Sequence, residues 1–214
     1  MNTILINNVV PEIFATRNDL RSEIWNTEAS FERGKTYLVR ADSGTGKSSL
    51  CSYLYGQRGD YRGEILFDNT DIAKFSTNEW CKVRREHISI LFQDLRLFGE
   101  LTALENVEIK NRLTHHRNTA QIKSWFEELG IADKLNSRID RMSYGQQQRV
   151  ALIRALCQPF DFLILDEPIS HLDDRNSDIM RDIILREVST TGAGVIATSI
   201  GKHMNIDYDK QLSL

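Results

Sequence analysis

The chain has 214 residues, of which 41% are hydrophobic and 27% are charged, with a formal net charge of −3. These values fit one substantial globular domain, or a core with a subdomain, and the lack of a Lys/Arg-rich run argues against nucleic acid as a partner. No apolar run approaches the roughly 18 residues that span a bilayer, and the N-terminus lacks the pattern of a secretory signal. The cysteines, Cys51, Cys81 and Cys157, are odd in number and widely separated, which predicts reduced thiols in a cytosolic protein.

The first part of the chain alternates short apolar runs with a helical pattern. Residues 37–39 predict a buried strand that runs directly into a glycine-containing segment, ADSGTGKSS, at 41–49. Residues 46–54 predict a helix after it, and residues 63–67 and 88–92 predict two further strands.

The middle of the chain, residues 94–158, has no strong strand pattern. Helices are predicted at 101–112 and 145–157, and at 122–129, where apolar residues recur at i, i+3, i+4 and i+7. This part predicts an all-helical insertion.

Strand patterns return after the insertion. Residues 162–165 are continuously apolar, which is typical of a strand covered on both faces, and residues 194–198 and 211–214 predict further strands. The chain is therefore predicted to be an α/β protein with a parallel-sheet core made of residues 1–93 and 159–214.

The glycine-containing segment is close to the phosphate-binding pattern G-x-x-x-x-G-K-[ST]. In such a loop, backbone N–H groups and a helix N-terminus bind phosphates, and glycines let the backbone approach closely. Lys47 is expected at the β- and γ-phosphates and Ser48 at Mg²⁺, whereas the alternative is a surface turn with a solvated lysine. The predicted ATP-binding residues of the loop are Ala41, Asp42, Ser43, Gly44, Thr45, Gly46, Lys47, Ser48 and Ser49.

Two carboxylates follow the apolar run at 162–165. Asp166 suits a Mg²⁺ ligand, and Glu167 suits the general base that polarises the attacking water. An acidic turn at a strand end is the alternative, but the occurrence of the loop and these carboxylates in one chain argues against it.

Together these residues resemble an ABC-type ATPase, the nucleotide-binding subunit of ATP-driven transporters. The resembling segments follow in family order over nearly the whole chain: ADSGTGKSS (41–49), LFQD (91–94), MSYGQQQRVALIRAL (142–156), ILDEP (164–168) and SHLD (170–173). The third segment is the most specific, because Ser143, Gly145 and Gln146 match the LSGGQ signature of the family. The resemblance implies one ABC ATPase domain over residues 1–214, with a P-loop (RecA-like) core, an N-terminal β region and a helical subdomain, 94–158, that carries the signature.

The resemblance also implies how ATP and Mg²⁺ are bound. Two copies of the domain are expected to form a head-to-tail dimer, with each ATP between the loop of one copy and the signature of the other, where a helix N-terminus favours an anionic phosphate. Asp173 is expected at the dimer seam, and Gln93 is expected to contact Mg²⁺ or the attacking water. Phe14 stands where the family often places an aromatic residue that stacks on adenine, although a core phenylalanine fits equally well.

Residues 98–107, FGELTALENV, are similar to the lipoprotein-releasing, macrolide-export and cell-division subgroup. In that subgroup the region docks a cytoplasmic helix of a membrane partner. The resemblance therefore implies a homodimer that joins a separate transmembrane permease and contacts the inner face of the cell membrane only through it. The alternative is an amphipathic helix that packs on its own domain.

Several positions depart from the family pattern. Ala41 replaces the first loop glycine and costs little where φ is negative. Tyr144 adds bulk beside the γ-phosphate of the opposing site, and a ring turned outward would weaken closure without preventing it. Ser199 stands where the family usually has a histidine at the γ-phosphate, and a serine is shorter and cannot become cationic. His203 either takes that role, if its loop folds back, or is a surface residue.

Three functions compete on these residues. The first is an ATP-hydrolysing subunit that drives a membrane transporter, with Glu167, Gln93 and Ser199 at the catalytic site. The second is a weakly hydrolysing, regulatory ATP-binding module that controls a membrane partner, which Ser199, Tyr144 and Ala41 favour. The third, a soluble ABC ATPase of DNA repair or translation, is disfavoured because the chain lacks a long coiled-coil insertion, a second ATPase unit and a basic stripe.

Overall fold

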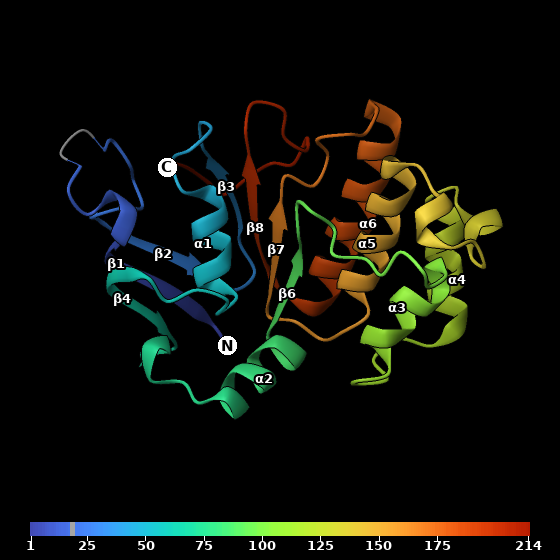
Figure 1. Ribbon diagram of the computed structural model, residues 1–214, viewed down its shortest axis with the longest axis horizontal. Helices are drawn as coiled ribbons and strands as arrows, with labels where there is room; N and C mark the ends of the chain where they lie inside the picture. Colours follow the sequence, from blue (N-terminus) through green and yellow to red (C-terminus); the bar gives the residue numbers. More distant parts are fainter. Residues whose placement is uncertain (18–19) are drawn as a thin grey trace.

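The computed structural model describes residues 1–17 and 20–214 (Figure 1). A five-stranded parallel sheet, in the order β6–β7–β8–β3–β9, forms the centre of the molecule and confirms the predicted α/β class. Its strands are β3 (Thr36–Arg40), β6 (Ile88–Leu91), β7 (Phe162–Asp166), β8 (Gly194–Ser199) and β9 (Lys210–Ser213).

A four-stranded antiparallel sheet, in the order β2–β1–β4–β5, lies beside the parallel one. Its strands are β1 (Thr3–Pro11), β2 (Glu28–Glu32), β4 (Tyr61–Phe67) and β5 (Thr70–Asp71). The strand predicted at 63–67 therefore belongs to this N-terminal β region and not to the parallel core.

The helices are short apart from the last one, and most begin at a side-chain cap. Ser76, Thr102 and Ser143 each start a helix with a capping box, in which the cap residue and the third helical residue satisfy each other's backbone N–H groups. The α-helices are α1 (Lys47–Leu54), α2 (Thr77–Glu86), α3 (Ala103–Asn111), α4 (Thr119–Glu128), α5 (Tyr144–Leu156) and α6 (Asp174–Thr191). The 3₁₀ helices are η1 (Glu12–Phe14), η2 (Ile72–Lys74), η3 (Ala132–Lys134) and η4 (Ile139–Arg141).

The parallel sheet separates two hydrophobic cores. Along β7, Phe162 and Ile164 pack with α1 and the antiparallel sheet, whereas Leu163 and Leu165 pack with the helices on the other face. Successive side chains of a strand point to opposite faces, so a strand buried on both sides reads as one continuous apolar run. This explains the uninterrupted pattern at 162–165.

Residues 94–158 are mainly helical. Between residues 94 and 158 the described chain forms no strand, apart from a single bridge between Thr102 and Arg138. Ile122, Trp125 and Phe126 of α4 are buried against this helical part. No described helix is both long and apolar enough to cross a membrane.

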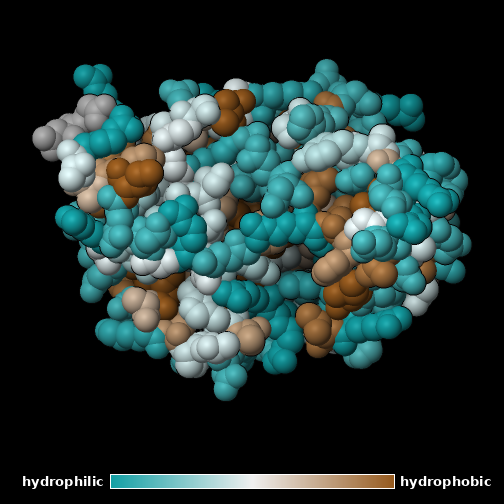
Figure 2. Space-filling model, in the orientation of Figure 1, coloured by the Kyte–Doolittle hydropathy of each residue, from teal (hydrophilic) through white to brown (hydrophobic). Residues whose placement is uncertain are grey.

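The surface is mostly hydrophilic on the face shown in Figure 2, with hydrophobic patches beside η1 and α3. The carboxyl ends of β3, β6, β7 and β8 all point to the upper edge of the sheet in Figure 1. In α/β proteins this is the edge at which ligands bind.

Candidate functional site

The segment that follows β3 forms a tight loop before α1. Gly44 and Gly46 have φ angles of +83° and +100°, which side chains other than glycine rarely adopt. The loop surrounds a cavity of about 430 Å³, here called the loop cavity. Its lining includes Asp42, Ser43, Gly44, Gly46, Lys47, Ser48 and Ser49, which sequence analysis assigned to ATP binding.

Two aromatic residues lie against Gly46. A Cβ atom built there would stand 2.9 Å from Cε2 of Phe14 and 3.2 Å from Nε1 of Trp25. The Trp25 indole N–H also donates a hydrogen bond of 2.9 Å to the Thr45 carbonyl oxygen. Phe14 lines the loop cavity, as an adenine-stacking residue must, whereas Trp25 supports the loop from outside and was not predicted.

Ala41 lies at the strand exit, apart from the lining of the loop cavity. It is buried, its φ is not among the positive values, and its N–H donates a 3.1 Å hydrogen bond to the Ser199 carbonyl oxygen. The replacement of the first loop glycine therefore requires no strained backbone.

Lys47 is buried and forms an ion pair with Glu167. Burial lowers the pKa of Lys47, and the negative charge of Asp166 opposes that shift. Glu167 has a φ of +49°, an uncommon conformation for this residue type that often marks functional positions. The loop lysine and the predicted general base thus occupy one side of the loop cavity.

The three predicted metal ligands, Ser48, Gln93 and Asp166, line a second cavity of about 420 Å³. Burial raises the pKa of Asp166, while a 2.7 Å hydrogen bond from the Thr198 hydroxyl favours its charged form. A hydroxyl, an amide and one carboxylate suit Mg²⁺, which prefers oxygen ligands and takes others from phosphates and water. The described residues form no cluster of three or more His, Cys, Asp or Glu side chains that would suit another metal.

The signature residues start α5 and lie apart from the loop cavity of their own chain. Ser143 is the N-cap: its Oγ accepts a 3.4 Å hydrogen bond from the Gln146 N–H, and the Gln146 side chain accepts a 3.0 Å bond from the Ser143 N–H. A Cβ atom at Gly145 would meet Leu172 at 3.4 Å, so the helix start packs closely on the chain around Leu172. Ser143 itself is exposed, and no described signature residue lines the loop cavity.

Tyr144 does not point away from the protein as an outward-turned ring would. Its hydroxyl donates a 2.6 Å hydrogen bond to the Gln93 carbonyl oxygen, and its ring meets His171 edge-on with centroids 4.5 Å apart. This contact between the signature and Gln93 was not predicted, because nothing in the local sequence pairs the two segments.

Asp173 is the N-cap of α6 and does not line the loop cavity. Its Oδ1 accepts a 2.8 Å hydrogen bond from the Asn176 N–H, and this bond lowers the pKa of Asp173. The residue is exposed, as a seam residue is expected to be.

Ser199 ends β8, and its hydroxyl donates a 2.6 Å hydrogen bond to the Lys202 carbonyl oxygen. The next residue, Ile200, lines the loop cavity instead, and none of the described lining residues is a histidine. His203 lies 3.3 Å from Arg40, and it lines a different cavity together with Arg40 and Ser199.

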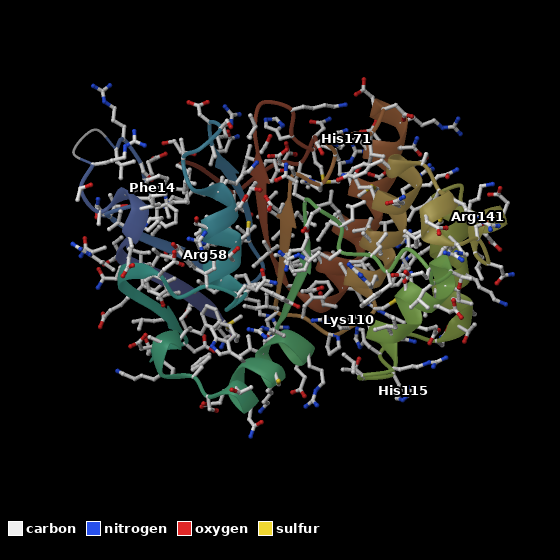
Figure 3. All side chains as sticks on the ribbon, in the orientation of Figure 1. Phe14, Arg58, Lys110, His115, Arg141 and His171 are labelled. Carbon is white, nitrogen blue, oxygen red and sulfur yellow. The ribbon has the colours of Figure 1, made fainter. Side chains whose placement is uncertain are left out.

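Arg58 is a further cation that sequence analysis missed. It lines the loop cavity, donates a 3.0 Å hydrogen bond to the Ser49 hydroxyl and pairs with Asp60. Arg58 and Phe14 are both labelled in Figure 3, near α1. No sequence motif connects Arg58 to the loop, so only the fold could reveal it.

Comparisons with known proteins agree on the type of chain. A family model described as ABC transporter matches residues 24–170. The macrolide export ATP-binding/permease protein MacB of Shewanella sp. (strain ANA-3) is 30% identical over 191 residues, which are 86% of this chain and 28% of that protein. The phosphonates import ATP-binding protein PhnC of Rhodopseudomonas palustris (strain BisB5) is 36% identical over 169 residues, which are 73% of this chain and 62% of that protein. The chain therefore spans less than a third of the macrolide-export relative.

Solved structures share the fold. The dimeric bacterial ABC transporter cassette MJ0796 has a TM-score of 0.77 at 24% identity, with 91% of this chain and 87% of that chain covered. A bacterial Atm1-family ABC exporter with ATP bound has a TM-score of 0.79 at 22% identity, with 100% of this chain and 37% of that chain covered.

The loop geometry generates a binding prediction. We expect Lys47→Ala to weaken Mg-ATP affinity by about 10- to 150-fold, because one charged hydrogen bond to phosphate contributes roughly 1.5–3 kcal/mol. Calorimetric titration with ATP measures the change, and Lys74→Ala, which removes an exposed lysine paired with Asp71, is the matched control. Equal affinity of Lys47→Ala and wild type would contradict the assignment.

Proposed function

The chain belongs to the ABC transporter family, and we propose that it is the ATP-binding and ATP-hydrolysing subunit of a membrane transporter. Family membership confirms the predicted class of enzyme, an ABC-type ATPase. One observation carries the proposal: two groups of side chains lie together at one edge of the parallel sheet. The first is the ion pair of Lys47 and Glu167 in the loop cavity. The second is the set of oxygen ligands in the neighbouring cavity, Ser48, Gln93 and Asp166.

Each of these residues has a defined part in the proposed reaction. Lys47 binds the β- and γ-phosphates, and loop N–H groups bind the phosphate oxygens. Ser48, Gln93 and Asp166 would hold Mg²⁺, which supplies charge neutralisation on the phosphates. Glu167 accepts the proton of the attacking water.

The ion pair between Lys47 and Glu167 implies that nucleotide binding precedes the activation of water. While Lys47 is paired with Glu167, neither residue is available for its own part. Phosphate binding draws Lys47 away, because a polyphosphate carries more negative charge than one carboxylate. Glu167 is then free to accept a proton, so activation of water follows nucleotide binding.

A head-to-tail dimer completes the proposed site. The exposed Ser143 and the start of α5 are apart from the loop cavity of the same chain, which supports their use by a second copy. A helix N-terminus offers free N–H groups that favour an anionic phosphate. The dimeric cassette that shares the fold is in line with this arrangement.

The proposed membrane partner is a separate permease that docks beside α3, within the segment 98–107 and just after it. Phe98, Ile109 and Leu113 are 54%, 43% and 57% exposed, unusual values for large apolar side chains that cluster near one helix. The hydrophobic surface beside α3 in Figure 2 belongs to this region. We propose that the chain lies in the cytoplasm and reaches the membrane only through this contact.

Basic side chains lie beside this apolar surface. A cavity of about 180 Å³ between α3, α5 and β6 is lined by Ile109, Lys110, Arg96 and Arg154, and none of its described lining residues is a carboxylate. Burial lowers the pKa of Lys110 to about 8, with the charges of Arg154 and Arg84 acting in the same direction. Lys110 points from α3 toward the parallel sheet (Figure 3). An amphipathic helix with an acidic side chain would fit this groove.

One observation favours the alternative function, a regulatory module that binds ATP and hydrolyses it slowly. The Ser199 hydroxyl already donates to Lys202, and an apolar residue, Ile200, lines the loop cavity where the family usually has a histidine contact. Losing one donor to the transferred phosphate costs on the order of 10²–10³ in rate.

The dimer leads to the second prediction. Glu167→Gln keeps the shape of the side chain but removes the charge that activates water and competes for Lys47. We expect turnover to fall by roughly 10²–10⁴, ATP to bind more tightly, and a stable ATP-bound dimer to appear in sedimentation. The double variant with Lys47→Ala should stay monomeric. A single variant that remains monomeric at saturating ATP would count against the head-to-tail site.

The third prediction concerns Ser199, and it distinguishes an ATP-hydrolysing transporter subunit from a regulatory module that hydrolyses ATP slowly. We expect Ser199→His to raise turnover while ATP affinity changes little, because a transition-state contact affects kcat more than binding. His203→Ala should leave turnover unchanged, since His203 contacts Arg40 and not the loop cavity. If Ser199→His has no effect and wild-type turnover equals that of ordinary transport ATPases, the regulatory alternative loses its support.

The docking groove gives the fourth prediction. Ile109→Glu adds a charge to the apolar surface, so binding to membranes washed free of peripheral proteins should fall about tenfold or more. ATP affinity should not change. Ala132→Glu, an exposed position in η3, controls for the added charge, and protease-treated membranes control for binding to lipid alone. Unaltered binding of Ile109→Glu to untreated membranes would exclude this surface.

A further inference from the structure

The loop that follows β6 carries Gln93 into both cavities of the site. After Asp94, two consecutive non-glycine residues, Leu95 and Arg96, have φ angles of +57° and +49°. This left-handed conformation is unfavourable for such residues and persists only where surrounding contacts require it. The loop therefore depends on its neighbours for its shape.

One helix contacts this loop near both of its ends. At the start of α5, the Tyr144 hydroxyl donates a 2.6 Å hydrogen bond to the Gln93 carbonyl oxygen. Near the other end, the Arg154 guanidinium donates to the carbonyl oxygens of Leu95 and Arg96. The helix that begins with the signature is thus bonded to the backbone on either side of Asp94.

Tyr144 also joins a third segment. Its ring lies edge-on to His171, with centroids 4.5 Å apart, in the turn that leads to α6. The glycine that the LSGGQ pattern has at this position possesses no side chain and could make neither contact. The connection among signature, Gln93 and the turn before α6 is therefore a property of this chain.

We propose that Tyr144 is a positioning residue for Gln93, and that it couples the signature to the metal-binding cavity of the same chain. When a second copy binds its phosphate at the start of α5, any shift of that helix is passed to Gln93 through the phenol hydroxyl. The proposal rests on the ATPase function proposed above, but its first test needs no turnover.

The hydroxyl can be removed without other change. Tyr144→Phe keeps the ring on His171 and deletes only the hydrogen bond to Gln93. In the absence of nucleotide, hydrogen exchange should quicken about 3- to 10-fold at the amides of Leu95 and Arg96, which donate to the carbonyl oxygens of Phe92 and Asp94 at 3.1 and 2.6 Å. The matched control is Tyr208→Phe, since the Tyr208 hydroxyl has no hydrogen-bond partner in the described part of the chain. Unchanged exchange in Tyr144→Phe would overturn the proposal, whether or not the protein hydrolyses ATP.

Kinetics then separates positioning from general stability. We expect Tyr144→Phe to lower kcat about 3- to 10-fold with KM for ATP within about twofold, because one hydrogen bond is lost. Adding Tyr144→Phe to Gln93→Ala should cause no further loss, since the hydroxyl acts through Gln93. Full additivity of the two changes would overturn the proposal. Absence of turnover in wild type would instead count against the ATPase function, with the exchange result still deciding the role of Tyr144.

Discussion

The parallel register of the central sheet is the constraint on which the site depends. β7 lies between β6 and β8, and β3 lies on the other side of β8, so Asp166 stands opposite Thr198 and Arg40 opposite Ser199. Because parallel strands end at the same edge, this register brings the phosphate loop, both carboxylates and the segment after β8 together. A slip of one residue in β7 would turn Asp166 to the other face of the sheet and separate it from Thr198.

Charge is concentrated and buried at this edge, which is expensive in free energy unless partners are present. Lys47 and Glu167 form an ion pair, and the Thr198 hydroxyl donates a hydrogen bond to Asp166. Leaving one member of such a pair alone typically costs about 3–5 kcal/mol. These buried charges therefore stabilise the protein only while each has a partner, and a polyphosphate can take the place of Glu167 as the partner of Lys47.

Local patterns in the sequence were sufficient for the loop, the strand-end carboxylates and the signature, because each depends on residues close together in the chain. The continuous run at 162–165 and the i, i+3, i+4, i+7 pattern of α4 likewise predicted their elements. The polar segment that forms α6 was not predicted, since only its packed face, with Met180 and Ile184, identifies it. Contacts between distant segments, such as Trp25 with Thr45, Arg58 with Ser49 and Tyr144 with Gln93, could not be predicted. These contacts depend on how whole elements pack. The same is true of the loop cavity, which is lined by Ile200 and not by Ser199.

Trp25 gives this chain an internal optical reporter. Its indole ring stands within 3.2 Å of where a Cβ atom of Gly46 would lie, and its N–H donates to the Thr45 carbonyl oxygen. The other two tryptophans, Trp80 and Trp125, belong to α2 and α4, and neither lines the loop cavity. Intrinsic fluorescence of the unlabelled protein therefore contains one emitter that is hydrogen-bonded to the phosphate loop and two that belong to other elements. A change in the hydrogen bonding of Thr45 alters the surroundings of the Trp25 indole directly, so the emission of this residue can report the state of the loop without an added probe.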